Sequence, residues 1–268
     1  MNDDSPVLLE VDGEIVTITL NRPAALNSID HPMALALHRS IVESADVPGA
    51  RAVVLRGAGR SFCGGGDIAA MHAHRADMPA FIERMIDAFH AGVMALHRSR
   101  LPVIASVHGA VAGGGFSLAL ACDLVIATRG TRFVVAYPQL GAPADGGLSY
   151  RLSRQLGAAR AFEMLTGPEP LPAENAMALG LINGVVDGDT ADAEARRRAH
   201  GLAALPRQSV EELKQLVAAQ SDEALEAQLA REKAAFLRCA ATEDFARRVD
   251  AFVSRATRRA RMPDGAAP

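Results

Sequence analysis

The chain has 268 residues, of which 49% are hydrophobic and 22% charged, and its formal net charge is −3. These values are typical of a globular protein, and the slightly acidic balance excludes the basic surface expected of a nucleic-acid-binding protein. No window approaches the ~18 uninterrupted apolar residues of a membrane-spanning helix, and the acidic N-terminus is unlike a signal peptide. Cys63, Cys122 and Cys239 form neither an even framework nor a C-x-x-C pair, so we expect a reducing location, the cytoplasm.

The N-terminal part of the chain alternates strand and helix patterns. Residues 7–11 and 15–20 flank a short polar turn, and the second run alternates polar and apolar side chains, which predicts a β-hairpin. Asp30 followed two residues later by Pro32 is typical of a helix start. Residues 52–55 are all apolar, as in strands buried on both faces of a parallel sheet. This alternation predicts an α/β crossover fold.

Two glycine runs each follow an apolar strand. Residues 64–66 follow the strand over 52–56, and residues 113–115 follow the strand over 103–107 and open an apolar helix. The first amides of a helix lack partners within the helix and carry the positive end of its dipole. Each run alone is compatible with a plain tight turn, but the pair favours two backbone N–H groups directed at one shared oxygen.

The rest of the chain is mostly helical. A stripe of apolar residues at helical spacing over 81–96 predicts a core helix. Further strands are expected over 124–127 and 132–135, and further helices over 147–155, 159–165 and 172–179. From Asp189 onward, amphipathic runs at 210–219, 223–239 and 243–259 predict long helices.

With these patterns the chain resembles the crotonase (enoyl-CoA hydratase/isomerase) family from about Glu14 to Phe252. Each motif by itself is weak, but their order and spacing are specific. The segments that carry the resemblance are Val16-Thr17-Ile18-Thr19-Leu20-Asn21-Arg22-Pro23 with Leu26-Asn27, Phe62-Cys63-Gly64-Gly65-Gly66-Asp67-Ile68, residues 109–123, Asp145-Gly146-Gly147, and Ala176-Met177-Ala178-Leu179-Gly180-Leu181-Ile182-Asn183.

The resemblance implies a fold, a domain division and an assembly. Residues 1–190 are expected to form a crotonase-like spiral of β-β-α turns that holds an acyl-CoA site. Residues 191–268 are expected to form a helical region that covers the active site and builds a homotrimer, often paired into a hexamer. The expected substrate is an acyl-CoA thioester, with no nucleic acid or membrane as partner.

The resemblance also implies catalytic groups. The backbone N–H groups of Gly64 and Gly114 align with the two donors that polarise the thioester carbonyl, an interaction that is worth roughly 3–4 kcal/mol per donor in other enzymes. Asp145 matches an aspartate that acts as base or nucleophile in several isomerases of the family and in the dehalogenase that acts on chlorobenzoyl-CoA. A carboxylate there could remove a proton from one carbon and return it to another. Alternatively, Asp145 caps the helix expected near Gly147.

The chain departs from the hydratases of the family at two positions. Those enzymes hold water between two glutamates, and the matching residues here are Ser117 and Gln139. Neither side chain accepts a proton near neutral pH, which puts hydration by two carboxylates in doubt. Each could instead hydrogen-bond the substrate, although a small helix residue and a loop amide are simpler interpretations.

Contacts to coenzyme A are expected from three further segments. In the family, the segment after Pro23 lies against coenzyme A, which places Ala25 and Leu26 near it. Asp67 and Ile68 match residues beside the adenine and ribose, although Asp67 is equally typical of a helix N-cap. Phe252 and Arg255 match a region that reaches the coenzyme A of a neighbouring subunit.

No resident cofactor or metal is expected. Coenzyme A is part of the substrate, and the eight histidines show no metal-ligand spacing such as H-E-x-x-H. Cys63, beside the first glycine run, is interpreted as a packed small residue instead of a nucleophile.

Three functions remain open on the sequence. The first is an enoyl-CoA isomerase, or a related isomerase of a ring-modified acyl-CoA, in which Asp145 moves a proton beside a stabilised thioester enolate. The second is a hydratase that adds water to a 2-enoyl-CoA with altered acid and base residues. The third is a trimer that binds acyl-CoA without catalysis.

Overall fold

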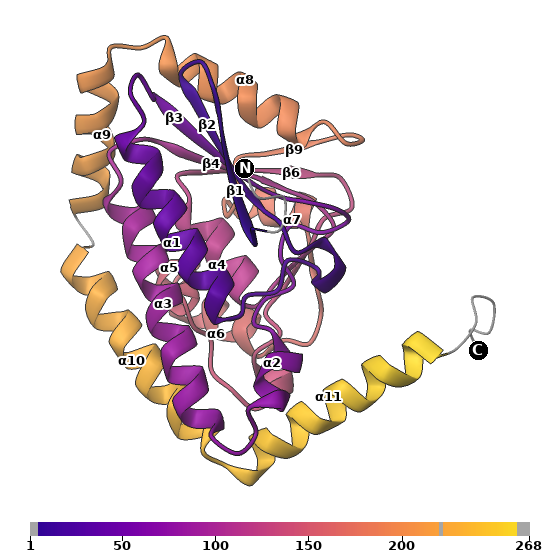
Figure 1. Cartoon of the computed structure of the whole chain (residues 1–268). Coiled ribbons are helices and arrows are strands. Elements are labelled where there is room, and N and C mark those ends of the chain that lie inside the picture. Colours follow the sequence, from indigo (N-terminus) through magenta and orange to yellow (C-terminus); the bar gives the residue numbers. More distant parts are fainter. Residues whose placement is uncertain (1–4, 220–221, 262–268) are drawn as a thin grey trace.

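The computed structural model describes residues 5–219 and 222–261. A six-stranded sheet has the order β1-β2-β3-β4-β6-β9 and lies in the upper half of the view in Figure 1. β1 (Val7–Asp12) and β2 (Ile15–Leu20) form the predicted antiparallel hairpin. From β2 onward all neighbouring strands are parallel, namely β3 (Ala52–Gly57), β4 (Val103–Val107), β6 (Leu124–Thr128) and β9 (Gly184–Val186).

A smaller sheet stands beside the large one. It has the order β5-β7-β8 and contains β5 (Ala110–Ala112), β7 (Arg132–Val134) and β8 (Leu171–Pro172). Only His108 and Gly109 separate β4 from β5. Gly109 has φ +61°, and a Cβ there would lie 2.1 Å from the Arg60 carbonyl oxygen, so the turn between the two sheets requires glycine.

Helices cover both faces of the large sheet. α1 (His31–Asp46) and α3 (Met78–Arg98) pack together over one face. α8 (Ala191–Ala203) covers the other face and buries an alanine at every fourth residue, at 191, 195, 199 and 203, against sheet residues such as Ile15 and Val54. Small side chains at this spacing let the helix approach the sheet closely. With both faces covered, all six residues of β2 are buried.

The local signals for helix starts and core faces are confirmed. The Asp30 carboxylate accepts a hydrogen bond from the Met33 amide at 2.8 Å, which caps α1. The apolar stripe of α3 is buried, including Phe81, Ile82 and Met85. The shorter helices are α2 (Ile68–Ala73), α4 (Gly114–Ala121), α5 (Leu148–Leu156), α6 (Ala158–Thr166), α7 (Ala173–Ala178) and the 3-10 turns η1 (Pro23–Ala25) and η2 (Pro138–Leu140).

The C-terminal part consists of α9 (Arg207–Ala219), α10 (Asp222–Ala240) and α11 (Glu243–Arg261). α10 packs along α3, and α11 contacts α2 and η2 before it extends away from the rest of the chain (Figure 1). The domain boundary after residue 190 stays a prediction. The first helix beyond that point, α8, is part of the core packing on the sheet.

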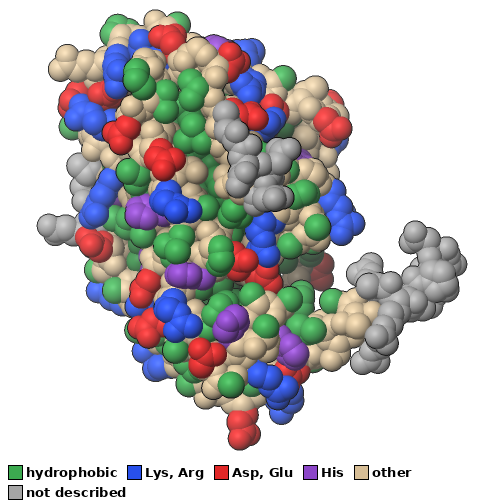
Figure 2. Space-filling view, viewed as in Figure 1, with side chains coloured by type: hydrophobic (Ala, Val, Ile, Leu, Met, Phe, Trp, Pro, Cys, Tyr) green, Lys and Arg blue, Asp and Glu red, His purple; other side chains and the backbone are tan. Residues whose placement is uncertain are grey.

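On the face that Figure 2 shows, basic and acidic side chains are interspersed, and neither kind forms a large patch of one charge. Among the described residues, no helix is both long and apolar enough to cross a membrane.

Candidate active site

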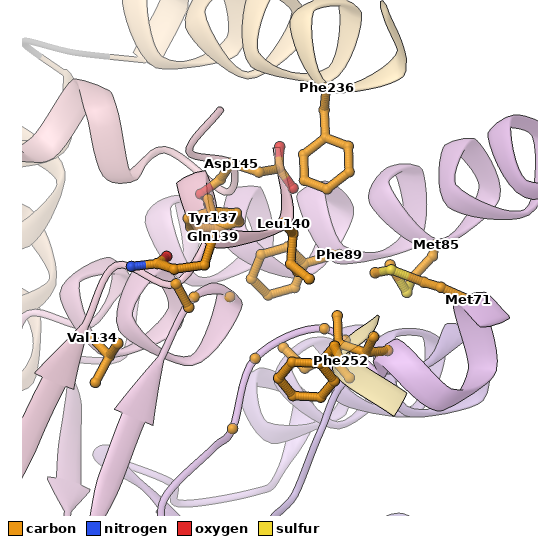
Figure 3. A pocket seen from close by; sticks show the side chains of 18 of the residues that line it. Met71, Met85, Phe89, Val134, Tyr137, Gln139, Leu140, Asp145, Phe236 and Phe252 are labelled. Atoms are coloured by element: carbon orange, nitrogen blue, oxygen red, sulfur yellow. Dashed lines mark hydrogen bonds between the residues drawn. The ribbon is translucent and has the colours of Figure 1, made fainter. Parts of the chain in front are cut away.

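A cavity of about 290 Å³ lies where the two glycine turns meet α3, α10 and α11 (Figure 3). Most of its lining is apolar. Among the lining residues, polar side chains are contributed by Tyr137, Gln139, Asp145 and Arg255. A mostly apolar hollow with a few polar groups is typical of a small-molecule site.

Asp145 is the only carboxylate among the lining residues, and its side chain is 6% exposed. One of its oxygens, Oδ1, lies 2.7 Å from Nε2 of His90, a residue of α3 with an 11% exposed side chain. A buried carboxylate and imidazole in hydrogen-bond contact can share a proton between them.

The backbone of Asp145 is held by two hydroxyl groups. Its carbonyl oxygen accepts hydrogen bonds from the Ser117 hydroxyl at 2.6 Å and from the Tyr137 hydroxyl at 3.2 Å. Burial raises the pKa of Tyr137 well above its ordinary value, so this hydroxyl stays protonated and able to donate. The two hydroxyls therefore fix the position from which the carboxylate of Asp145 faces the cavity.

Glu232 of α10 forms the third member of a buried cluster. Its side chain accepts hydrogen bonds from the Gly147 amide at 2.7 Å and from the Ser149 hydroxyl. The side-chain ligand atoms of His90, Asp145 and Glu232 all lie within 4.8 Å of one another. Burial raises the pKa of Glu232 to about 7, and the neighbouring charge of Asp145 adds to this rise. Glu232 can therefore gain or lose a proton near neutral pH.

This cluster has the donor atoms for a metal ion, but its hydrogen bonds favour a different use. Glu232 Oε1 accepts from Ser149 and Glu232 Oε2 from Gly147, and Nε2 of His90 is engaged with Asp145. Nε2 of His90 would have to give up its hydrogen bond to Asp145 to coordinate a metal ion, because an imidazole nitrogen has a single site for donation or for ligation. The arrangement suits a proton-sharing group better.

The two glycine turns are in direct contact. A Cβ on Gly65 would lie 2.8 Å from the Ala112 carbonyl oxygen and 3.4 Å from the Gly114 nitrogen. Gly65 has φ +93° and Gly113 has φ +48°, a region that residues with a side chain rarely adopt. These glycines therefore allow two backbone segments to meet at the cavity wall.

The prediction that the Gly64 amide faces a substrate oxygen is wrong. Its N–H donates to the Leu26 carbonyl oxygen at 2.8 Å. Within the described residues, the amide of Gly66 in the first turn and that of Gly114 in the second have no acceptor. Both glycines line the cavity, so Gly66 takes the place that the sequence assigned to Gly64.

The other predicted contacts divide into two groups. Ile68, Gln139, Phe252 and Arg255 line the cavity together with Gly64. Ala25 and Leu26 are absent from its lining, and they lie in or directly after η1. Their expected contacts with coenzyme A stay predictions.

Asp67 has a structural role in the described chain. Its carboxylate caps α2 through the Ala70 amide at 3.0 Å and pairs with Arg22 at 3.0 Å, while Asp67 itself is outside the cavity lining. The N-cap interpretation is confirmed. Contact with the nucleotide part of coenzyme A stays a prediction.

Two further expectations are corrected. Ser117 is a predicted substrate contact, but it is fully buried and its hydroxyl is bonded to the Asp145 carbonyl oxygen. Asp145 does not cap α5 either, because that helix begins after Gly147 without a side-chain cap. Cys63 is confirmed as a packed residue, since it is fully buried in the core, and this burial raises the pKa of its thiol to about 12.

The sequence analysis did not identify His90 and Glu232, although each is a titratable residue within an apolar helix stripe. His90 continues the four-residue spacing of Ile82 and Ile86 on α3, and Glu232 lies three residues after Leu229 on the buried side of α10. A titratable residue inside an apolar stripe is unfavourable unless it has a partner. Such residues therefore mark candidates for a buried polar site.

The strand order, the two sheets and the paired glycine turns define an α/β protein of the crotonase type. The sequence model of the family described as enoyl-CoA hydratase/isomerase matches residues 10–259. The chain belongs to this family, whose members are enzymes.

The chain is similar to curated and solved proteins over almost its whole length. It is 34% identical to a "Probable enoyl-CoA hydratase" of Rhodobacter capsulatus, covering 92% of this chain and 94% of that protein. It is 32% identical to the "1,2-epoxyphenylacetyl-CoA isomerase" of Escherichia coli, covering 93% and 95%. A solved enoyl-CoA hydratase/isomerase of Mycobacterium paratuberculosis has a TM-score of 0.86 at 30% identity, covering 94% of this chain and all of the other.

Proposed function

We propose that the protein is an acyl-CoA isomerase that moves a double bond within an enoyl-CoA. The thioester oxygen binds between the amides of Gly66 and Gly114, and Asp145 carries the proton from one carbon to another. The observation that supports this proposal most strongly is the position of a buried carboxylate on the wall of the same cavity as two unpaired amides. Fixed donors that face a developing negative charge stabilise an enolate at little reorganisation cost.

The fixed position of Asp145 favours proton transfer. Because Ser117 and Tyr137 hold its backbone oxygen, the carboxylate can approach one side of a bound acyl group without moving the chain. His90 stabilises the carboxylate by a hydrogen bond. A single carboxylate held in this way is sufficient for an allylic shift.

The test is turnover of a 3-enoyl-CoA, followed by the rise of absorbance of the conjugated thioester. Asp145→Asn is expected to lower kcat about 10²–10⁴-fold while calorimetry still detects binding of the ester. Asp46→Asn, at an exposed position at the end of α1, is the matched control. Full activity of Asp145→Asn would contradict the role of this residue.

The same assay distinguishes the two other candidate functions. A hydratase would lower the absorbance of crotonyl-CoA by adding water across its double bond. A protein that only binds acyl-CoA would give a calorimetric signal and no turnover with either ester. The internal hydrogen bond of Ser117 gives no support to water activation at that position.

His90 supports a second candidate reaction, displacement at a carbon that bears a halide. An oxygen of Asp145 would attack this carbon while the carbon–halogen bond breaks and halide leaves with the electron pair. Water, deprotonated by His90, would then attack the Asp145 carboxyl carbon. The bond from this carbon to the product oxygen breaks, the product oxygen takes the proton of the new carboxyl group, and His90 releases its proton to solvent, which restores the carboxylate and balances the departed halide. The observation in its favour is an imidazole whose Nε2 lies 2.7 Å from the carboxylate, a neighbour that a simple proton shuttle does not need.

Oxygen labelling separates the two reactions. After a single turnover in H₂¹⁸O, displacement leaves ¹⁸O in the peptide that contains Asp145, and the product keeps an oxygen from the protein. Isomerisation leaves that peptide unlabelled. Mass spectrometry of the digested protein reads out the difference directly.

We also propose a homotrimer as the working assembly. The resemblance to the family implies it, and α9 provides a candidate contact with the exposed apolar residues Leu213, Leu216 and Val217. Exposed apolar side chains grouped on one helix face are typical of an interaction surface.

A further inference from the structure

Aromatic side chains are concentrated in the cavity. The chain has nine Phe, two Tyr and no Trp, yet the cavity is lined by Phe89, Tyr137, Phe236 and Phe252. These rings come from α3, the turn before η2, α10 and α11. Four separate elements thus each direct one aromatic ring to the same cavity.

Three of these rings are held in fixed orientations. Phe89, Tyr137 and Phe236 are each at most 7% exposed. The Tyr137 and Phe236 rings meet edge to face, with centroids 6.4 Å apart and planes at 84°. The Tyr137 hydroxyl also lies 3.0 Å from the Ser117 hydroxyl. The cavity therefore presents preset ring faces and edges to an occupant.

The size and the remaining lining fit one ring. An apolar cavity of about 150 Å³ is sufficient to hold benzene in another protein, so about 290 Å³ accommodates a six-membered ring with its thioester and small substituents. Met71 and Met85 add two thioethers to the wall (Figure 3). Thioether sulfur makes favourable contacts with ring edges.

We propose that the acyl group of the substrate carries a planar ring, aromatic or conjugated, which binds among Phe89, Tyr137, Phe236 and Phe252. This inference depends on the proposed function, because it takes the same cavity as the acyl-CoA site. Aromatic pairs at centroid distances of about 4.5–7 Å are more favourable than their buried area alone accounts for. The glycine turns and Asp145 line the same cavity as these rings, so the ring and its thioester would share one site.

Calorimetry with matched esters tests the proposal. Benzoyl-CoA and cyclohexanecarbonyl-CoA have the same carbon skeleton, but only the first is planar and aromatic, and the second is the more hydrophobic. We expect benzoyl-CoA to bind at least about tenfold more tightly than cyclohexanecarbonyl-CoA and hexanoyl-CoA. Equal affinities, or tighter binding of the saturated ring, would overturn the planar-ring proposal and leave the acyl-CoA function intact. Failure of all three esters to bind would overturn the acyl-CoA function as well.

Two phenylalanine variants test whether the preference comes from these rings. Phe252 is 46% exposed and Phe162, on α6, is 70% exposed, so both tolerate replacement by leucine without loss of the core. Phe252→Leu is expected to lower the ratio of benzoyl to cyclohexanecarbonyl affinity about threefold, whereas Phe162→Leu, outside the cavity lining, leaves it unchanged. Equal ratios in Phe252→Leu and the wild type would contradict the part assigned to that ring.

Discussion

Gly65 is the residue at which the two glycine turns touch. Its φ is +93°, and a Cβ at this position would lie only 2.8 Å from the Ala112 carbonyl oxygen, which leaves no room for a side chain. Gly64, one position earlier, has no positive φ, and a Cβ there would meet only ordinary contacts at 3.4 Å. Gly64 therefore tolerates a small side chain, whereas Gly65 does not.

We expect Gly65→Ala to lower the free energy of unfolding by about 1–3 kcal/mol, from the unfavourable backbone region and the contact with Ala112. Turnover should fall with it, because the Gly66 and Gly114 amides would move apart. Gly64→Ala should change stability by less than about 1 kcal/mol. Urea unfolding and the absorbance assay measure both effects, and similar losses in the two variants would argue against this account of the turn.

Glu232 connects two elements, since it lies on α10 and accepts hydrogen bonds from the segment that leads into α5. Burial raises its pKa from the ordinary 4.5 to about 7. The folded chain therefore holds a proton on Glu232 at pH values where the unfolded chain has released it. The contribution of this bound proton to the free energy of unfolding is fully present below about pH 4.5 and is lost as the pH rises through about 7.

Between pH 4.5 and 7.5 we expect the unfolding free energy of the wild type to fall on the order of 3 kcal/mol more than that of Glu232→Gln. The figure follows from about 1.4 kcal/mol for each unit by which the folded and unfolded pKa values differ. Glutamine imitates the protonated carboxyl group and does not titrate, so its own profile should be flatter. Glu226→Gln, an exposed position on the same helix, is the control. Parallel pH profiles of the wild type and Glu232→Gln would show that Glu232 has an ordinary pKa in the folded chain.

The elements that the sequence predicted correctly are those that depend on residues close together in the chain. The hairpin, the cap of α1 by Asp30 and the apolar stripe of α3 depend on patterns within one segment, and all three are confirmed. The grouping of His90, Asp145 and Glu232 depends on contacts between residues 55 and more positions apart. No local spacing encodes such a contact.

The sequence prediction named Gly64 as the amide donor, whereas the structure indicates Gly66, and this error has a similar cause. All three glycines of the first turn have the same side chain, so the sequence cannot distinguish their amides. The choice is made by the Leu26 carbonyl oxygen, which comes from a separate turn of the chain and accepts the Gly64 amide. An account of every backbone hydrogen bond, possible only with the fold in hand, identifies the unpaired donors.

At the scale of the whole molecule, the exposed apolar residues of α9 lie outside the core that the chain builds for itself. Leu213, Leu216 and Val217 are 59%, 65% and 75% exposed and share one helix face. A charged side chain placed there would cost the single chain little, because these positions face solvent. In an assembly, by contrast, it would be buried without a partner.

We therefore expect the wild type to sediment as a trimer of 28.2 kDa chains, and Val217→Arg to shift the population toward the monomer with an unchanged circular dichroism spectrum. Leu35→Arg, at a 41% exposed position on α1, controls for the loss of an exposed apolar residue elsewhere. Sedimentation velocity over a range of protein concentrations separates the outcomes. A wild-type monomer would contradict the trimer itself, whereas a trimer that persists in Val217→Arg would place the contact between subunits on another face.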